Sequence, residues 1–277
     1  MCRLAWDGDP RVAPRTQSSL AVTGDGASYT LLNASPDLSQ QIRSTPALWP
    51  RDGTRHSPIG AVVLTNGDID HVAGLLSLRE RQPFRLVALA PVHAALDLNP
   101  MFSALSPEVV ERVVAQPGAV IETTPGVRVA LVPVPGKVPL YREGPAPEIG
   151  LESGETAGVF GTAGTMRLAY VPGCAALTEA LIARFSGADV VFFDGTVFHD
   201  DELIRADVGT KTGRRMGHVP IAGPGGSLDV LRRMRVRRTI YVHLNNTNPV
   251  LIEGSPERRL VEEAGLEVAY DAMEIVP

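Results

Sequence analysis

The chain has only two cysteines, Cys2 and Cys174, so a framework of disulfide bonds is excluded and a reducing compartment is expected. Aromatic residues make up 5% of the chain, which argues against base stacking on single-stranded nucleic acid. No apolar run reaches the length of a membrane span, and the N-terminus does not show the basic-then-apolar pattern of a secretory signal. We therefore expect a cytoplasmic protein.

The chain also has no excess of positive charge. The formal net charge is -5, which gives no electrostatic reason to expect nucleic acid or an anionic membrane as a partner. The hydrophobic content of 44% and the charged content of 21% are ordinary for a globular protein. A chain of 277 residues can form one large domain or two small ones, with a sizeable core in either case.

The most informative stretch is a turn that follows an apolar run at 59–63, which we interpret as a buried strand. It carries Asp68, Asp70 and His71 within four residues, and Gly74-Leu75-Leu76 then begins a helix. Such a turn directs several polar side chains to one place, as metal sites and acid–base sites require. The alternative is an ordinary turn with Asp68 or Asp70 as the helix N-cap, which explains one aspartate but not the whole group.

Apolar periodicity and turn residues predict the other elements. We expect an irregular segment over the first seventeen residues, a hairpin of 19–22 and 29–33, and a short helix that Ser35 caps. We expect strands at 59–63, 85–90, 119–123, 127–133, 157–161, 166–171, 188–194, 239–243, 266–269 and 273–276. We expect helices at 72–80, from Val92, at 100–118, 175–185 and 227–235, and after Ser255, with a loop at 133–147 that covers a site. Each half of the chain mixes paired strands with strand–helix units. This predicts a single α/β domain over 1–277, an αββα sandwich with two mixed sheets flanked by helices.

Three apolar strands end in titratable residues, namely Asp70-His71, Asp194 and His243. Because the carboxyl ends of parallel strands gather functional groups, we expect these side chains to converge. Two histidines and one carboxylate form the ligand set of non-haem Fe(II) sites, and zinc accepts the same groups. We therefore predict Asp70, His71 and His243 as metal ligands. For His243 the alternative is a buried histidine bonded to backbone, although the polar turn 245–249 after it favours a pocket.

His218, Asp194 and Asp68 are candidates for a catalytic base, a substrate anchor or a further ligand. Asp194 can instead simply begin a turn. We expect other titratable residues to be solvated or structural, namely His199, Asp200, Asp201, His56 and His93.

The turn Thr65–His71 resembles the metallo-β-lactamase superfamily signature T-H-x-H-x-D-H, with Asn66 and Asp68 at the first two histidine positions. This resemblance implies that one metal remains rather than two. The bridging aspartate of the superfamily is also missing, because Tyr170-Val171-Pro172-Gly173-Cys174 stands at its place. Hydrolysis by a hydroxide that bridges two metals is therefore not expected.

A closer resemblance covers nearly the whole chain. The chain is similar to the coenzyme PQQ synthesis protein B family at 15–19, 32–37, 65–76, 193–196, 211–218 and 243–249. This implies the αββα fold and a role in making pyrroloquinoline quinone (PQQ), a redox cofactor built from a Glu and a Tyr of a small peptide. It further implies Fe(II)- and O2-dependent hydroxylation of the tyrosine ring of a Glu-Tyr-derived precursor, with other PQQ biosynthesis proteins and a homodimer as further partners. The alternatives are a carrier that helps to transport PQQ or its precursor to the periplasm, and a mononuclear zinc hydrolase.

The N-terminal segment departs from the family pattern. Members of the family begin with a strand, a glycine-rich turn and a C-x-C-x-x-C cluster that holds a structural zinc, and only Cys2 matches the last of these. The resemblance therefore implies an incomplete structural zinc site, through loss of the first strand or a start codon assigned too late. A missing first strand would expose a sheet edge, so we expect a lower thermal stability than in an upstream-extended form.

Overall fold

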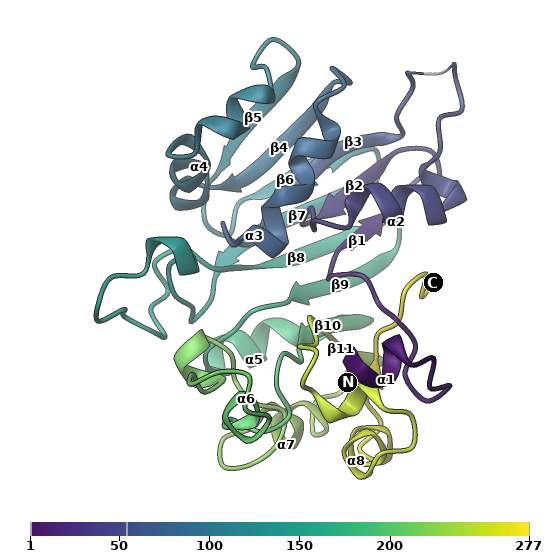
Figure 1. The fold of residues 1–277 in the computed structure, drawn as a ribbon. Helices are drawn as coiled ribbons and strands as arrows, with labels where there is room; N and C mark the ends of the chain where they lie inside the picture. The colour runs from purple at the N-terminus through teal and green to yellow at the C-terminus, as the bar shows by residue number, and fades with distance from the viewer. Residues whose placement is uncertain (1, 54, 277) are drawn as a thin grey trace.

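Two β-sheets lie back to back between two layers of helices in a computed structural model, which describes residues 2–53 and 55–276 (Figure 1). The first sheet has the order β1 (Leu20–Val22), β2 (Tyr29–Leu32), β3 (Ile59–Val63), β4 (Phe84–Leu89) and β5 (Val110–Ala115). The second has the order β12 (Glu267–Val268), β11 (Arg238–Val242), β10 (Val190–Asp194), β9 (Met166–Val171), β8 (Ala157–Ala163), β7 (Val127–Pro133) and β6 (Val120–Thr124). This confirms the predicted αββα sandwich.

Short helices cover the outer faces of both sheets. They are α1 (Cys2–Trp6), α2 (Leu38–Ser44), α3 (Ile69–Val72), α4 (Ala90–Asp97), α5 (Glu179–Phe185), α6 (Glu202–Arg205), α7 (Ser227–Leu231) and α8 (Pro256–Glu263). Ser255 caps α8 as predicted, because its side chain accepts a hydrogen bond from the Arg258 amide. In the part of the chain that the structure describes, no helix has the length and apolar content that crossing a membrane requires.

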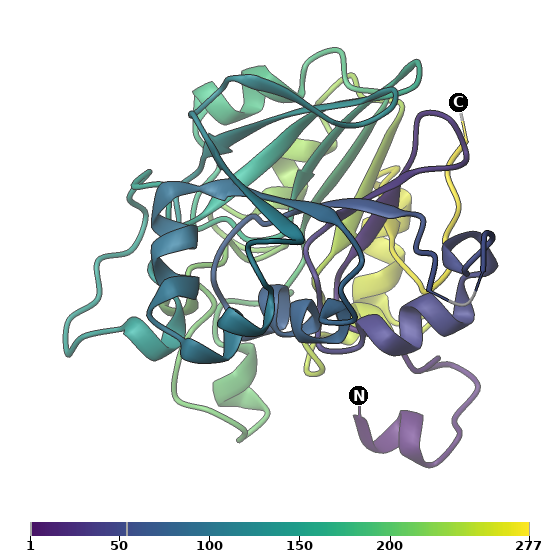
Figure 2. The ribbon, with the colours of Figure 1, turned by 90° about the horizontal axis from the view of Figure 1, so that it is seen from above.

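Parallel pairing brings the site-bearing strand ends together. In the first sheet β2, β3, β4 and β5 pair in parallel, and in the second β9, β10, β11 and β12 do the same. Strand β3 shows how both faces are buried, since Val62 packs on the helices and Val63 packs between the sheets. In both views the loop between β7 and β8 projects beyond the strands (Figure 1, Figure 2).

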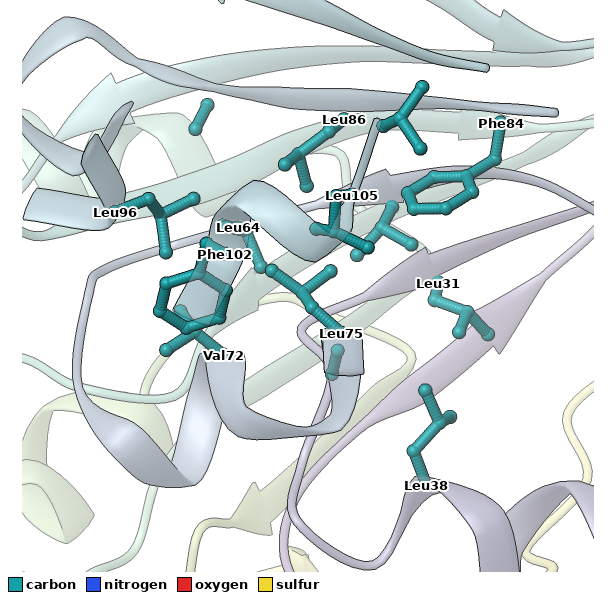
Figure 3. Packing of buried hydrophobic residues seen from close by; sticks show 14 of the residues in the cluster. Leu31, Leu38, Leu64, Val72, Leu75, Phe84, Leu86, Leu96, Phe102 and Leu105 are labelled. Carbon is teal, nitrogen blue, oxygen red and sulfur yellow. The ribbon is translucent and has the colours of Figure 1, made fainter. Parts of the chain in front are cut away.

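The turn after β3 is anchored by its apolar neighbours. Val72 and Leu75 point into a cluster with Leu64 and Leu96 (Figure 3), and all four side chains are buried. Gly74 lies against the chain before α2, where an added Cβ would be 2.1 Å from the Ser35 carbonyl oxygen. This packing fixes the position of α3, which carries Asp70 and His71.

Several predicted elements are wrong. The segment 100–118 is not a helix: a 3-10 turn, Pro100–Ala104, precedes strand β5, whose β-branched valines suit a strand paired with β4. The first residues contain a helix, α1, rather than irregular chain. Within the described residues, 273–276 form no strand.

Other boundaries shift. The predicted helix at 72–80 begins earlier, as α3 from Ile69 followed by a 3-10 segment, Ala73–Leu78. Helix α2 begins at Leu38 with Asp37 at its N-cap position, so the prediction of Ser35 as the cap is wrong. Local turn residues locate such boundaries only to within a few residues.

Candidate metal centre

The three predicted metal ligands lie together at the carboxyl ends of strands from both sheets. Asp70 and His71 come from α3 after β3, and His243 directly follows β11. Their ligand atoms all lie within 4.8 Å of one another. The Oδ2 atom of Asp70 is 2.9 Å from Nε2 of His243 and 3.7 Å from Nε2 of His71. This arrangement can hold one metal ion between two imidazoles and a carboxylate.

His71 shows that these residues fit such an ion. Its side chain is 2% exposed, and its Nε2 atom has no hydrogen-bond partner among the residues that the structure describes. Buried polar atoms of this kind are rare and need an explanation. Burial also lowers the pKa of His71 to about 4, despite the opposing charge of Asp70. The ring is therefore neutral at physiological pH, which is the form that binds a metal.

A threonine hydroxyl lies beside the other nitrogen of each histidine. Thr196 Oγ1 is 2.7 Å from Nδ1 of His243, and it donates to Oδ1 of Asp194 at 2.7 Å. A hydroxyl that donates to a carboxylate accepts from the ring, so His243 carries a proton on Nδ1, and Nε2, which faces Asp70, is the nitrogen that a metal would use.

Thr65 occupies the corresponding position at His71. Its Oγ1 atom is 3.2 Å from Nδ1 of His71 and donates to Oδ1 of Asn33 at 3.1 Å. The amide nitrogen of Asn33 is equally close to that ring nitrogen, at 3.2 Å. A metal on Nε2 of His71 requires the ring proton to be on Nδ1. Of the two neighbours of Nδ1, only the threonine oxygen can accept a hydrogen bond from that proton.

Asp194 and His218 form a second pair beside this group. The Oδ2 atom of Asp194 is 2.8 Å from Nδ1 of His218 and also accepts from the Cys174 amide at 2.9 Å. Burial alone would raise the pKa of Asp194, but the charge and hydrogen bond of His218 and the hydrogen bond of Thr196 hold it below its usual value. The aspartate therefore stays ionised and orients His218 with Nε2 available for proton transfer.

Asp194, His218 and His243 form another group whose ligand atoms lie within 4.8 Å of one another. The two oxygens of Asp194 already accept four hydrogen bonds, from Cys174, His218 and the amide and hydroxyl of Thr196. Such a saturated carboxylate is better suited to orienting a histidine than to binding a metal.

Asn66, Gly67 and Asp68 contact the loop between β7 and β8. The Asp68 carboxylate accepts from the Leu140 amide at 3.0 Å, and the Gly67 carbonyl accepts from the Tyr141 hydroxyl at 2.9 Å. Asn66 forms a backbone bridge with Thr156 and accepts from the Asp68 amide through Oδ1 at 2.9 Å. Asp68 occupies the N-cap position of α3, but its side chain makes no cap hydrogen bond. The two positions that replace histidines of the superfamily signature thus hold this loop over the site.

A pocket of about 210 Å³ contains five of the six predicted site residues. It is lined by Asn66, Asp68, Asp70, His71, Lys137, Leu140, Glu143, Lys211, Met216, His218 and His243. The sixth, Asp194, is fully buried behind His218. His93, expected to be structural or exposed, is buried with Nε2 3.0 Å from the Val113 carbonyl oxygen, which is a structural contact.

The sequence did not indicate the supporting residues. Thr65 and Thr196 stand beside predicted site residues, but nothing in their spacing identifies them as partners of imidazole nitrogens. Lys137 and Glu143 lie in the segment that was predicted as a covering loop. The side chain of Cys2, the residue that the resemblance matches to a structural zinc cluster, lies outside the described residues.

The fold and the site together define a metallo-β-lactamase-type protein, and the family model "Beta-lactamase superfamily domain" matches residues 29–244. The chain is 55% identical to a coenzyme PQQ synthesis protein B of Methylobacterium nodulans, over 99% of this chain and 91% of that protein. It belongs to the coenzyme PQQ synthesis protein B family.

Solved structures agree with this assignment. A zinc-bound PqqB from Methylobacterium extorquens is 53% identical, with a TM-score of 0.97 over 100% of this chain and 92% of that one. A diphosphatase from the PhnP family is only 19% identical, with a TM-score of 0.64 over 95% of this chain and 85% of that one, and so shares the fold alone.

Proposed function

We propose that the chain acts in PQQ biosynthesis and hydroxylates the tyrosine ring of a Glu-Tyr-derived precursor with Fe(II) and O2. The observation that carries this proposal is the convergence of Asp70, His71 and His243 in one pocket, with the Nε2 atom of His71 buried and unpaired among the described residues. A set of two histidines and one carboxylate leaves positions for O2 and a substrate oxygen. The relatives named for PQQ synthesis and the zinc-bound PqqB support the pathway and a metal centre.

The residues of the chain have separate roles in this reaction. Asp70, His71 and His243 would hold the iron, which would supply the activation of O2. One oxygen atom is added to the ring and the other leaves as water, with two electrons from an added reductant such as ascorbate. His218 takes the phenol proton of the tyrosine ring on Nε2, which makes the ring more electron-rich. Asp194 stabilises the resulting imidazolium through its 2.8 Å contact with Nδ1. The Asp68 carboxylate holds Leu140 and the covering loop in place.

Turnover under controlled metal loading tests the proposal. Protein purified without oxygen is loaded with Fe(II), then exposed to air, ascorbate as electron donor and a Glu-Tyr peptide, and the products are analysed by mass spectrometry. We expect a gain of one oxygen on the tyrosine ring. Zinc-loaded protein and Asp70→Ala serve as controls and should give no product. Absence of a mass gain in protein with an intact iron site would contradict the proposal.

A carrier that binds PQQ or its precursor is the second candidate. The observation that favours it is the use of Asn66 and Asp68 to hold a loop, at positions where the superfamily signature has metal ligands. Tight binding of the quinone, with no turnover under iron or zinc, would support a carrier. If Asp70→Ala abolishes turnover and leaves quinone binding intact, the enzyme is supported instead.

A further inference from the structure

The wall of the pocket near the covering loop is built from charged residues that the reaction above does not use. Glu143, in the loop between β7 and β8, has its carboxylate 3.0 Å from Lys137 Nζ, 3.3 Å from Lys211 Nζ and 3.2 Å from the Arg215 guanidinium. Lys137, Glu143 and Lys211 line the pocket together with the candidate metal ligands. We call Lys137, Glu143, Lys211 and Arg215 the cationic cluster.

The cluster carries more positive charge than its own carboxylate neutralises. Three cations surround one anion, which leaves two positive charges. Lys137 and Lys211 line the pocket that also contains Asp68 and Asp70, whereas Arg215 is not part of the pocket lining. Burial would raise the pKa of Glu143, but its hydrogen bonds with Lys137 and Arg215 lower it to about 2. Glu143 is therefore ionised throughout the physiological range.

The same loop offers a contrasting ion pair. Arg142 and Glu155 pair one to one at 3.2 Å, which is sufficient to hold a loop residue in place. The cluster differs because three cations surround one carboxylate, which is 7% exposed, while the Lys211 and Arg215 side chains are 37% and 36% exposed. Lys137 is fixed more firmly, since its side chain lies against Gly217, where an added Cβ would be 3.1 Å from Cγ of the lysine. Two of the three cations are thus accessible to an incoming anion.

We propose that the cationic cluster is a carboxylate-binding subsite, in which Glu143 occupies the place that a ligand carboxylate takes when it binds. The ligand class is a small carboxylic acid that reaches the metal group with its other end. That this ligand is the Glu-Tyr-derived precursor rests on the proposed function, whereas the preference for a carboxylate rests on the cluster alone. Amine and guanidinium groups make stronger hydrogen bonds to carboxylates than to neutral amides.

Calorimetry on the zinc-loaded protein tests this subsite without any oxygen chemistry. The probes are the dipeptide Glu-Tyr and Gln-Tyr amide, its counterpart without carboxylates. We expect Lys211→Met and Arg215→Met each to weaken dipeptide binding by about tenfold and to leave amide binding unchanged. Glu143→Gln removes the competing carboxylate, so it should tighten dipeptide binding severalfold.

Arg142→Met and Glu155→Gln are matched controls, because they make the same charge changes on the loop between β7 and β8, outside the pocket lining. They should leave both affinities unchanged. The proposal is overturned if the dipeptide and the amide bind equally, if Lys211→Met has no effect, or if the dipeptide does not bind. Lys211 is accessible enough for this variant to fold, and an unchanged unfolding midpoint checks that. If the protein binds Glu-Tyr more tightly than Gln-Tyr amide but never hydroxylates the peptide, the proposed function is contradicted and the carboxylate-binding subsite is still supported.

Discussion

The Thr196 hydroxyl is a single group on which two functional residues depend. It donates to Asp194 at 2.7 Å and lies 2.7 Å from His243 Nδ1. It therefore determines which nitrogen of His243 carries the proton, and it helps to hold Asp194, which orients the candidate base His218. Thr196→Val keeps the shape of the side chain but removes both contacts. We expect zinc affinity to fall by about 10- to 100-fold, as is typical when a partner of a ligating histidine is lost. Competition with a chromophoric chelator measures the change.

Thr196→Ser is the matched control for this experiment, because it retains the hydroxyl and should keep most of the affinity. Equal zinc affinities in the Val and Ser variants would show that the hydroxyl does not orient His243.

The two candidate ligand histidines should respond differently to pH. Burial lowers the pKa of His71 to about 4. Burial also acts to lower the pKa of His243, but the hydrogen bond and charge of Asp70, with the charges of Asp194 and Asp68, outweigh it and raise the pKa above its usual value. In the metal-free protein, a proton therefore competes with a metal at His243 at a higher pH than at His71. Below the raised pKa of His243, zinc affinity should fall by about tenfold per pH unit as one proton is displaced.

Imidazole NMR titration of the metal-free protein checks this assignment directly. Asp70→Asn removes the carboxylate charge, so the His243 resonance should titrate at a lower pH than in the unaltered protein. A His243 titration that is unaffected by this substitution would contradict the role given to Asp70.

At the scale of the element, Gly74 is the position where the candidate metal turn meets the chain before α2. An added methyl group would lie 2.1 Å from the Ser35 carbonyl oxygen and 2.8 Å from Leu38 Cβ, so the turn would have to shift. We expect Gly74→Ala to lower the free energy of unfolding by about 1–3 kcal/mol and to weaken zinc binding. Urea denaturation and zinc titration measure the two effects.

Gly144 provides the control for that substitution. It lies in the covering loop, and an added Cβ there has no heavy atom within 4 Å. Gly144→Ala should leave the free energy of unfolding within about 0.5 kcal/mol of the original value. If both alanine variants are equally stable, the close packing of the turn does not matter.

Two elements show what the sequence could and could not predict. Strand β3 and its turn were predictable, because an apolar run followed by Asp-x-Asp-His has few other interpretations. The segment that forms β5 was not, since valines at 109–110 and 113–114 match helical spacing as well as a strand. Pairing with β4 decides between the two, and that pairing is a tertiary contact that no local window contains.

At the scale of the whole molecule, the candidate metal group joins the two sheets. Asp70 and His243 are 173 residues apart in the chain, and their convergence was predictable only because each follows a buried strand. The cationic cluster was not predictable in the same way, since Lys137 and Glu143 approach Lys211 through two loops without periodic pattern. Side chains placed by regular strands can be inferred from sequence, whereas those placed by loop packing need the fold.

Metal binding should therefore stabilise both sheets together. Zinc at about 100 times its dissociation constant should add about 2.7 kcal/mol to the free energy of unfolding and raise the melting temperature of a single transition. Differential scanning calorimetry tests this, with Asp70→Ala as the variant that should lose the shift. A second transition that zinc leaves unchanged would contradict the prediction that 1–277 is a single domain.

The side-chain contacts of Asn66 and Asp68 oppose a stepwise return to the two histidines of the superfamily signature. Asp68→His alone would add an imidazole and remove the carboxylate that accepts from the Leu140 amide. Asn66→His alone would remove the side-chain oxygen that accepts from the Asp68 amide. Each single step back toward the superfamily signature removes a contact of the turn or of the loop before a complete ligand set exists. Selection for a two-metal hydrolase from this starting point would have to pass through forms that have lost a contact of Asn66 or Asp68 and do not yet have the ligands for a second metal.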